Sequence, residues 1–206
     1  MEEKIQKIKE WLGTGSINIF GLPMSGKDTV GVRLAELLGG KFLSSGEIIR
    51  AKEAETHNNI SASGKLVPTN MFYDLVLPYF YREDLKEFPL VLSSIGRWSG
   101  EENAVIDATR ESGHETKAVV ILNISESDVK DRWETAKMLG SDRGDRADDK
   151  LESVFQTRID EFREKTLPVI IAYKNMGKLV EVRADKTREE VLVELINKLY
   201  EKSLEG

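Results

Sequence analysis

One short segment carries the residue types and the spacing best suited to chemistry. Residues 21–29 read GLPMSGKDT and fit the pattern G-x-x-x-x-G-K, with a threonine hydroxyl one place later than usual. Glycines allow consecutive backbone N–H groups to surround an anion, and Lys27 adds a positive charge for the β- and γ-phosphates of a nucleoside triphosphate. We therefore expect a phosphate-binding loop for ATP. The expected contacts are Gly21, Met24, Ser25, Gly26, Lys27, Asp28 and Thr29.

The elements beside this segment distinguish such a loop from a plain glycine turn with an exposed lysine. Residues 17–20 (INIF) are rich in β-branched side chains and are followed by a glycine and a proline, which predicts a strand that ends in a loop. Between residues 26 and 38 apolar side chains recur at helical intervals, and Gly39 and Gly40 stand where a helix C-cap belongs. Strand, loop and helix is the order that a phosphate-binding loop requires.

The same alternation continues along the chain. Further strands are predicted at residues 41–44, 90–93, 118–124 and 179–182. Further helices are predicted at 2–12, from 47, around 69–81, from 100, from 127, up to 174 and from 187. Strands that alternate with helices and are apolar on both faces are typical of a parallel sheet covered on each side. The sequence therefore predicts an α/β fold, a doubly wound parallel β-sheet flanked by helices, in a single domain of residues 1–206.

The composition excludes several classes of protein. The 206 residues carry a net charge of -6 and include no cysteine. The negative charge argues against a nucleic-acid partner, and the absence of cysteine rules out disulfides, a thiolate nucleophile and cysteine-bound metals. No stretch approaches the roughly 20 apolar residues that span a bilayer. We expect a cytoplasmic monomer that binds small molecules and neither nucleic acid nor membranes, with His57 and His114 in contact with solvent.

Four further motifs follow the loop in a distinctive order. They are SSGEIIR at residues 44–50, GKLV at 64–67, SSIGR at 93–97 and DRADD at 145–149. In the adenylate kinase family, a group of nucleoside monophosphate kinases, the corresponding motifs are S-T-G-D followed by an arginine, G-K-L-V, D-G-F-P-R and G-R-x-D-D. The chain therefore resembles this family over nearly its whole length, from residue 17 to residue 199.

The resemblance implies a phosphate-binding-loop kinase with two moving parts. A mobile monophosphate-binding arm is expected at residues 45–72 and a short lid at residues 137–149. By the same resemblance, Arg50 pairs with the phosphate of the acceptor nucleotide, Ser45 touches its nucleoside and the backbone at Val67 borders its base. The arm would thus hold the acceptor, and small-molecule nucleotides would be the partners of this chain.

The resemblance also implies a catalytic group made of cations. Phosphoryl transfer depends on positioning and on neutralising charge, so no general base is needed. Arg97 is expected to clamp phosphate through its planar guanidinium, and Arg132 to stack on the donor base as well. The catalytic residues expected on this basis are Lys27, Arg97, Arg132, Arg146 and Arg158.

Two residues depart from the family pattern where a metal ion is expected. Asp28 stands where adenylate kinases usually have a small residue and many other phosphate-binding loops have a serine or threonine, and Ser93 replaces the aspartate of D-G-F-P-R. A carboxylate beside phosphates is repulsive unless a cation intervenes. We therefore hypothesise that Asp28, with Thr29 nearby, anchors Mg2+ directly or through water. The alternative is that Asp28 only caps the N-terminus of the helix.

Glu101 is a third departure, at the position where the family has a glutamine that reads adenine. A carboxylate only accepts hydrogen bonds, whereas adenine presents one amino donor beside a ring acceptor. Guanine presents two adjacent donors, so Glu101 is expected to bind the acceptor base and to shift preference away from adenine. AMP is nevertheless the default acceptor that the family implies. In the lid, Ala136 stands in place of an arginine, with Lys137 or Arg143 as its substitutes.

Two other functions remain open from the sequence. The chain is alternatively a kinase of another small acceptor, such as GMP, a deoxynucleotide or a metabolite, or a weakened nucleotide-binding module with a sensing role. The loss of one aspartate and one arginine favours the sensor. The cations retained at family-like positions favour the enzyme, and they are Lys27, Arg50, Arg97, Arg132 and Arg158.

Overall fold

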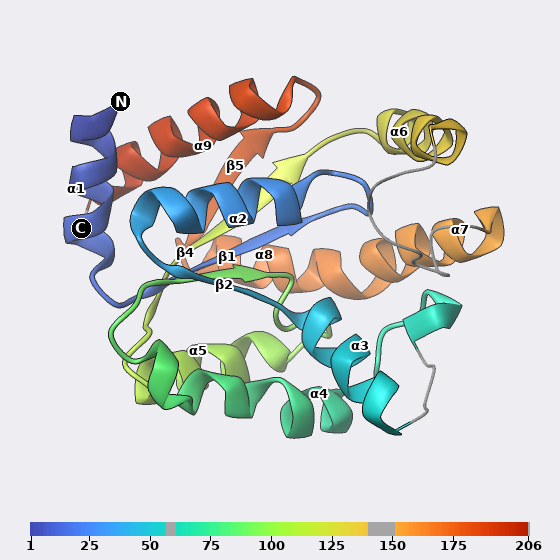
Figure 1. Ribbon diagram of the computed structural model, residues 1–206, viewed down its shortest axis with the longest axis horizontal. Helices are drawn as coiled ribbons and strands as arrows, with labels where there is room; N and C mark the ends of the chain where they lie inside the picture. The colour runs from blue at the N-terminus through green and yellow to red at the C-terminus, as the bar shows by residue number, and fades with distance from the viewer. Residues whose placement is uncertain (57–60, 140–150, 206) are drawn as a thin grey trace.

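Five parallel strands form the centre of the molecule in the computed structural model, which describes residues 1–56, 61–139 and 151–205 (Figure 1). They are β1 (Ser16–Gly21), β2 (Lys41–Ser44), β3 (Leu90–Ser93), β4 (Thr116–Asn123) and β5 (Leu179–Arg183). Their order in the sheet is β2-β3-β1-β4-β5, and each neighbouring pair is parallel. The predicted doubly wound parallel sheet is confirmed.

Helices cover both faces of this sheet because its central strands are buried on both sides. One face packs against α1 (Glu2–Leu12), α2 (Lys27–Leu38) and α9 (Arg188–Ser203), of which α1 is drawn at the left edge of Figure 1 and α2 and α9 in its upper part. The other face packs against α3 (Ser45–Thr56), α4 (Thr69–Leu75), α5 (Glu101–Glu111), α6 (Glu126–Met138), α7 (Glu152–Glu161) and α8 (Leu167–Asn175). Side chains alternate along a strand, so Ile17 and Ile19 of β1 join the first layer and Phe20 joins the second.

Two helices are interrupted where the sequence pattern predicts continuous ones. The helix expected around residues 69–81 divides into α4 and the 3-10 helix η2 (Leu77–Tyr81), because Pro78 has no N–H to donate to the preceding turn. The long helix expected before the last strand divides into α7, the π-helical turn η5 (Phe162–Thr166) and α8. Pro168 stands in the first turn of α8 and disrupts the α-helical hydrogen bonds in the same way. Such π-helical turns are frequent at functional sites.

His114 is buried, so the expectation that it contacts solvent is wrong. Its Nδ1 lies 2.8 Å from the carbonyl oxygen of Thr14, and the Thr14 hydroxyl donates to the carbonyl of Gly113 at 2.9 Å. The ring therefore joins the turn before β1 to the turn before β4. The polar residues beside His114 in the sequence suggested that it is exposed. A polar side chain is nevertheless buried here, because the backbone of a buried turn needs a hydrogen-bond partner. His57 lies outside the described residues.

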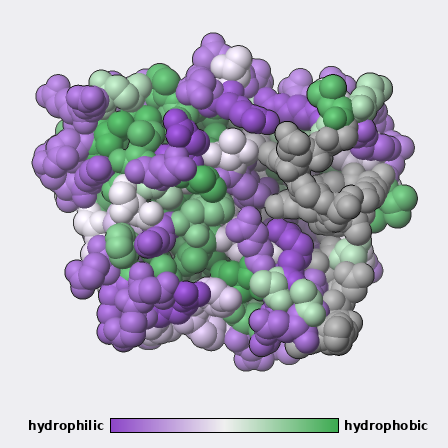
Figure 2. Space-filling model, in the orientation of Figure 1, coloured by the Kyte–Doolittle hydropathy of each residue, from purple (hydrophilic) through white to green (hydrophobic). Residues whose placement is uncertain are grey.

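Hydrophilic side chains cover most of the molecular face in Figure 2, and hydrophobic ones gather in smaller patches. Many exposed charges belong to ion pairs within one helix, such as Arg33 and Glu36 at 2.9 Å. Exposed pairs of this kind contribute little to stability, which comes instead from the two buried layers. In the part of the chain that the structure describes, no helix is both long and apolar enough to cross a bilayer.

Asn18 fixes the loop that follows β3. Its side chain is buried in β1, where Nδ2 donates to the carbonyl oxygen of Ile95 at 2.7 Å and Oδ1 accepts from the N–H of Ile95 at 3.2 Å. Strands β1 and β3 are neighbours in the sheet. Because Ile95 stands two residues before Arg97, the amide of Asn18 sets the point from which the Arg97 loop begins.

Replacing Asn18 by alanine is expected to lower the free energy of unfolding by about 2–4 kcal/mol, because two buried hydrogen bonds are lost and both Ile95 backbone groups are left unsatisfied. Urea unfolding with an unchanged m-value measures the loss. Asn123→Ala is the control, because Asn123 is exposed at the end of β4 and its removal should cost roughly 0.5 kcal/mol or less. Equal losses for the two variants would show that the buried amide does not hold the loop.

Candidate functional site

The loop predicted to bind phosphate joins the end of β1 to the start of α2. Gly21 is closely packed, because a Cβ there would lie 2.5 Å from Ser25 Oγ and 3.2 Å from Leu122 Cβ. Met24 in this loop has a φ of 63° and Ser94, just after β3, a φ of 52°; among the described residues they are the two with positive φ that are not glycine. Strained backbone of this kind clusters at functional sites. Both loops lie at the carboxyl edge of the sheet, where open α/β folds bind ligands.

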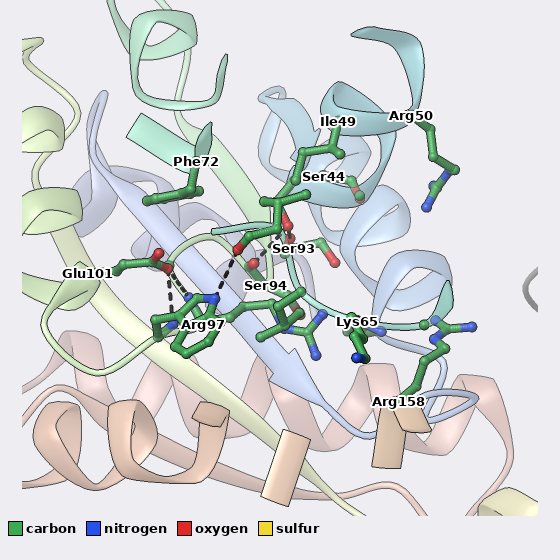
Figure 3. Close-up of a pocket in the computed structure, with 18 of the residues that line it drawn as sticks. Ser44, Ile49, Arg50, Lys65, Phe72, Ser93, Ser94, Arg97, Glu101 and Arg158 are labelled. Atoms are coloured by element: carbon green, nitrogen blue, oxygen red, sulfur yellow. Dashed lines mark hydrogen bonds between the residues drawn. The ribbon is translucent and has the colours of Figure 1, made fainter. Parts of the chain in front are cut away.

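A cavity of about 110 Å³, which we call the inner pocket, lies between this loop, α3 and the loop after β3 (Figure 3). Cations from five different parts of the chain line it, namely Lys27, Arg50, Lys65, Arg97 and Arg158. The carboxylates that accompany them are those of Asp28 and Glu101. An excess of positive charge in a concave site attracts phosphate groups. The inner pocket is therefore suited to an anionic ligand.

Arg97 is held in the inner pocket from two sides. Its Nε donates to the Thr166 hydroxyl at 3.4 Å, and its backbone N–H donates to Glu101 Oε2 at 2.7 Å. Burial, and after it the neighbouring charge of Arg158, lower the pKa of Arg97 to about 10. The guanidinium is still protonated at neutral pH. Because its charge is poorly solvated, an anion placed beside it would bind favourably.

Glu101 presents one satisfied and one unsatisfied carboxylate oxygen. Its Oε2 accepts hydrogen bonds from the backbone N–H groups of Arg97 at 2.7 Å and Trp98 at 3.0 Å, as Figure 3 shows for the carboxylate beside Arg97. The side chain is only 2% exposed, and Oε1 has no hydrogen-bond partner within the described residues. A buried carboxylate oxygen without a donor is costly. In the inner pocket it provides a ready acceptor for a ligand N–H.

Two predicted residues on α3 face the inner pocket. Ser45 donates from its hydroxyl to the carbonyl oxygen of Ser94 at 2.8 Å and so joins α3 to the strained loop after β3. The guanidinium of Arg50 folds back over Gly46, where an added Cβ would lie 2.9 Å from Arg50 Nη1. Arg50 therefore lies close to the first turn of its own helix and within the wall of the pocket.

Trp98 is a pocket residue that the sequence did not predict. Its Nε1 donates to the carbonyl oxygen of Val67 at 2.9 Å, so the backbone group expected to border a base is already hydrogen-bonded. Lys65 and Phe72 also line the pocket without having been assigned a role. The signal for Trp98 was its position directly after Arg97. Its partner could not be identified because Val67 lies far away in the sequence.

Asp28 and Ser93 form a direct hydrogen bond across the inner pocket. The Ser93 hydroxyl donates to Asp28 Oδ1 at 2.5 Å, joining the end of β3 to the first turn of α2. The carboxylate thus lies on the helix and the hydroxyl on the strand, whereas the family that the sequence resembles has an aspartate at the strand position and a small residue on the helix. In the described ranges, no group of three or more acidic or histidine side chains is arranged to bind a metal ion. A cation here would need phosphate oxygens or water to complete its coordination.

A larger cavity of about 830 Å³, the outer pocket, lies on the other side of the loop. It is bounded by α2, by α6 and by the connection from β5 to α9. Its lining includes Met24, Ser25, Gly26, Thr29, Arg132, Ala136, Lys186 and Arg188. The two cavities therefore meet at the predicted phosphate-binding loop, with Lys27 and Asp28 on the inner side.

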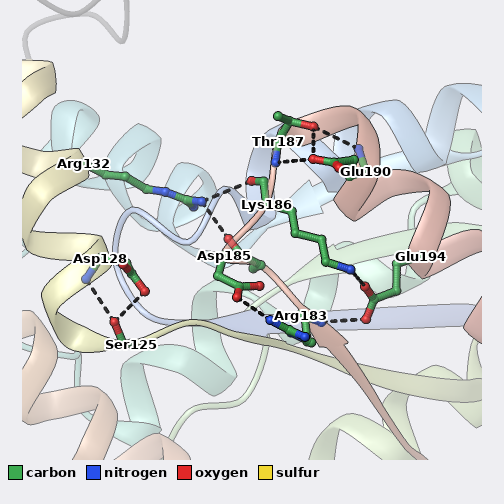
Figure 4. Close-up of polar contacts among 10 residues, drawn as sticks. Ser125, Asp128, Arg132, Arg183, Asp185, Lys186, Thr187, Glu190 and Glu194 are labelled. Carbon is green, nitrogen blue, oxygen red and sulfur yellow. Dashed lines mark hydrogen bonds and ion pairs between the residues drawn. The ribbon is translucent and has the colours of Figure 1, made fainter.

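Arg132 reaches across the outer pocket from α6 to the β5–α9 connection (Figure 4). Its Nη2 donates to the carbonyl oxygen of Ala184 at 2.6 Å, and its Nη1 to that of Ser25 at 3.4 Å. The connection is itself fixed, because Thr187 and Glu190 form a capping box at the start of α9. The flat guanidinium is thereby held in place between the loop and α9.

The predicted residues within the described ranges divide between the two pockets, except Gly21, which is in the lining of neither. Lys27, Asp28, Ser45, Arg50, Val67, Arg97, Glu101 and Arg158 line the inner one. Met24, Ser25, Gly26, Thr29 and Arg132 line the outer one. Arg146, Arg143 and most of the lid expected at 137–149 lie outside the described residues. Lys137 is the first residue of that segment, and its Nζ lies 4.3 Å from the centroid of the Trp133 ring.

Comparison with known proteins places the chain among small-molecule kinases, although no family model matches it. It is 31% identical over 188 residues to an adenylate kinase of Thermus thermophilus, covering 87% of this chain and 95% of that protein. It is 29% identical over 179 residues to UMP-CMP kinase 2 of Oryza sativa subsp. japonica, covering 84% and 69%. Among solved structures, a gluconokinase from Sinorhizobium meliloti 1021 has a similar fold, with a TM-score of 0.61 and 18% identity over 93% of this chain and 94% of that one.

Proposed function

This chain belongs to the adenylate kinase family of nucleoside monophosphate kinases, and we propose that it transfers the γ-phosphoryl group of ATP to a nucleoside monophosphate. The observation that carries the proposal is the meeting of two pockets at one loop, with the cations concentrated on the inner side. A donor in the outer pocket and an acceptor in the inner pocket would meet with their phosphates at Lys27. AMP is the default acceptor, by analogy with the adenylate kinases.

In this proposal the chain acts by positioning and by charge. The loop N–H groups and Lys27 hold the β- and γ-phosphates of ATP, and Arg132 lies against its base or ribose. Arg50 and Arg97 hold the acceptor phosphate, and one of its oxygens attacks the γ-phosphorus while the bond to the β-phosphate oxygen breaks. Arg97 and Arg158 neutralise the charge of the group in transit. The arm at 45–72 and the lid at 137–149 would exclude water.

The residues on the inner side also fit a magnesium ion. Asp28 provides a carboxylate, and its bond to Ser93 fixes the orientation of that carboxylate. Mg2+ usually keeps several waters and is held by one or two carboxylates together with substrate phosphates, which matches a site of this size. When bound, the ion would neutralise phosphate charge. Asp28 would hold it, directly or through water, with the Thr29 hydroxyl nearby.

Glu101 supports a proposal about the acceptor base. Its unsatisfied Oε1 requires an N–H donor, and its Oε2 is already held by two backbone groups. The adenine edge offers an amino donor next to a lone pair, which a carboxylate repels, whereas guanine offers two adjacent donors. Glu101 would therefore weaken the preference for AMP relative to GMP.

An acceptor series tests both the function and this preference. Magnesium ATP is incubated with AMP, GMP, CMP, UMP and their deoxy forms, and chromatography measures the diphosphate formed. We expect turnover with at least one of them, and we expect Glu101→Gln to raise the AMP to GMP ratio of kcat/KM about tenfold, the value of roughly one hydrogen bond. Glu102→Gln is the matched control, because this buried carboxylate caps Gly100 at 2.7 Å and should leave the ratio unchanged.

Other outcomes of the series favour the other candidate functions. Tight ATP binding without any diphosphate would support a sensor, and turnover with a non-nucleotide acceptor alone would support a metabolite kinase. An unchanged AMP to GMP ratio of kcat/KM in Glu101→Gln would show that this residue does not read the acceptor base.

We further propose that the protein acts as a cytoplasmic monomer.

A further inference from the structure

Two side chains from the body of the protein hold neighbouring backbone groups of the predicted acceptor arm. Glu161 Oε2 accepts from the N–H of Leu66 at 3.0 Å, and Trp98 Nε1 donates to the carbonyl oxygen of Val67 at 2.9 Å. Residues 65–68 form neither helix nor strand, so these groups have no partner within a regular element. The two side chains therefore take the place of secondary structure in fixing this part of the arm.

Lys165 connects the two side chains to each other. Its Nζ forms an ion pair with Glu161 Oε1 at 2.5 Å and lies 4.1 Å from the centroid of the Trp98 ring. The Lys165 and Glu161 side chains are only 22% and 10% exposed. A charge pair removed from water contributes little net stability, whereas breaking it is costly, so its value lies in fixing geometry.

The same helical segment also contacts the opposite side of the inner pocket. Lys165 is followed by Thr166, whose hydroxyl accepts from Arg97 Nε at 3.4 Å. One turn before Glu161, the side chain of Arg158 lines the pocket and packs against Gly64, where a Cβ would lie 3.1 Å from Arg158 Cγ and 2.8 Å from a backbone oxygen of α7. The end of α7 and the π-helical turn η5 thus contact both the arm and the Arg97 loop.

We propose that Trp98, Glu161 and Lys165 form a latch that holds the acceptor arm against the body of the protein. They are positioning residues, because their contacts to Leu66 and Val67 set the wall of the pocket in which the acceptor would bind. The role in acceptor binding rests on the proposed function. The attachment of the arm does not depend on the proposed function, because it is a property of the protein without ligand.

Hydrogen exchange tests the latch without requiring activity. Trp98→Phe keeps an aromatic side chain but loses the five-membered ring of the indole together with its N–H. We expect the amide of Leu66, which Trp98 does not bond, to exchange about fivefold faster or more. Glu161→Ala should accelerate the same amide directly. Trp11→Phe, on α1 at the far end of the molecule in Figure 1, is the matched control and should leave that amide unchanged.

Steady-state kinetics then tests positioning, with the monophosphate that the unaltered protein phosphorylates fastest as the probe. We expect Trp98→Phe and Glu161→Gln each to raise the KM for the acceptor about fivefold, with kcat and the KM for ATP nearly unchanged. The double variant should show less than the product of the two effects, since the residues act as one unit.

Each failure has a distinct meaning. If the Leu66 amide exchanges at the same rate in Trp98→Phe and in the unaltered protein, the latch is wrong. If exchange rises but the acceptor KM does not, the contacts hold the arm without positioning the acceptor, and that part of the inference is overturned. If no monophosphate is phosphorylated at all, the proposed function fails, while the exchange result still decides whether the latch exists.

Discussion

Lys27→Ala is expected to lower the rate of phosphoryl transfer about a thousandfold while the protein remains folded. Lys27 begins α2 directly after the loop and lines the inner pocket, where the two pockets meet. Its charge would face the phosphoryl group as negative charge shifts toward the leaving oxygen, and loss of one such interaction costs roughly a hundredfold to a thousandfold or more. A thousandfold loss corresponds to about 4 kcal/mol of transition-state stabilisation.

Single-turnover assays with magnesium ATP and the preferred monophosphate measure this loss, and circular dichroism confirms the fold. Lys7→Ala is the control, because Lys7 is exposed on α1 and pairs only weakly with Glu10 at 3.9 Å. Lys27→Arg should not restore the rate, because a planar guanidinium does not reproduce the compact ammonium in a tight loop. A rate within tenfold of the unaltered protein in Lys27→Ala would show that transfer does not take place at this loop.

The fold and the loop could be predicted because their signals are local. The β-branched run at 17–20, the glycines of the loop and the spacing of apolar residues in 26–38 each lie within a few residues of one another. Parallel strands buried on both faces leave few arrangements other than a layered sheet. Arg97 was identified because residues 93–97 (SSIGR) resemble the D-G-F-P-R motif of the adenylate kinase family.

The contacts between distant segments could not be predicted from the sequence. Trp98 and Val67 are 31 residues apart, and Leu66 and Glu161 are 95 apart. No periodic pattern links them, and each partner group belongs to the backbone and therefore has no side-chain signal. His114 illustrates the same limit, because its polar neighbours suggested exposure while its partner is the backbone of Thr14.

Asp28 shows how sequence and structure together sharpen a hypothesis. The sequence indicated that an acidic residue had been gained on α2 and lost from the end of β3, but it did not establish that the two positions touch. The Ser93 hydroxyl is 2.5 Å from Asp28 Oδ1, so the carboxylate gained on α2 and the hydroxyl at the end of β3 are joined by one hydrogen bond. If the carboxylate and the hydroxyl together orient a metal ion, both groups must be present, and it matters less which of the two positions carries the carboxylate.

The pairing of Asp28 with Ser93 predicts that loss of the Asp28 carboxylate strongly raises the Mg2+ requirement. It also predicts that a carboxylate placed at position 93 reverses part of that change. Asp28→Ala should raise the Mg2+ concentration required for half-maximal activity by about tenfold to a hundredfold and lower kcat by a similar factor. Mn2+ binding to the ATP complex, followed by electron paramagnetic resonance, should weaken to the same extent, which measures the metal without turnover. Ser93→Ala should cost less, because it keeps the carboxylate and loses only the group that orients it.

The decisive variant combines Asp28→Ser with Ser93→Asp, which restores one carboxylate and one hydroxyl in the opposite order. We expect it to recover most of the metal affinity that Asp28→Ala loses, because the same two groups would again be joined across α2 and β3. The N-cap of α2 is Gly26, and Asp28 lies in the first turn. If Asp28 only stabilises the N-terminus of α2 through its charge, Asp28→Ala should lower the free energy of unfolding by about 0.3–1 kcal/mol and leave the magnesium requirement unchanged. The combined variant would then bind Mn2+ no better than either single change. This result would show that the Asp28 carboxylate stabilises α2 and does not bind the metal ion.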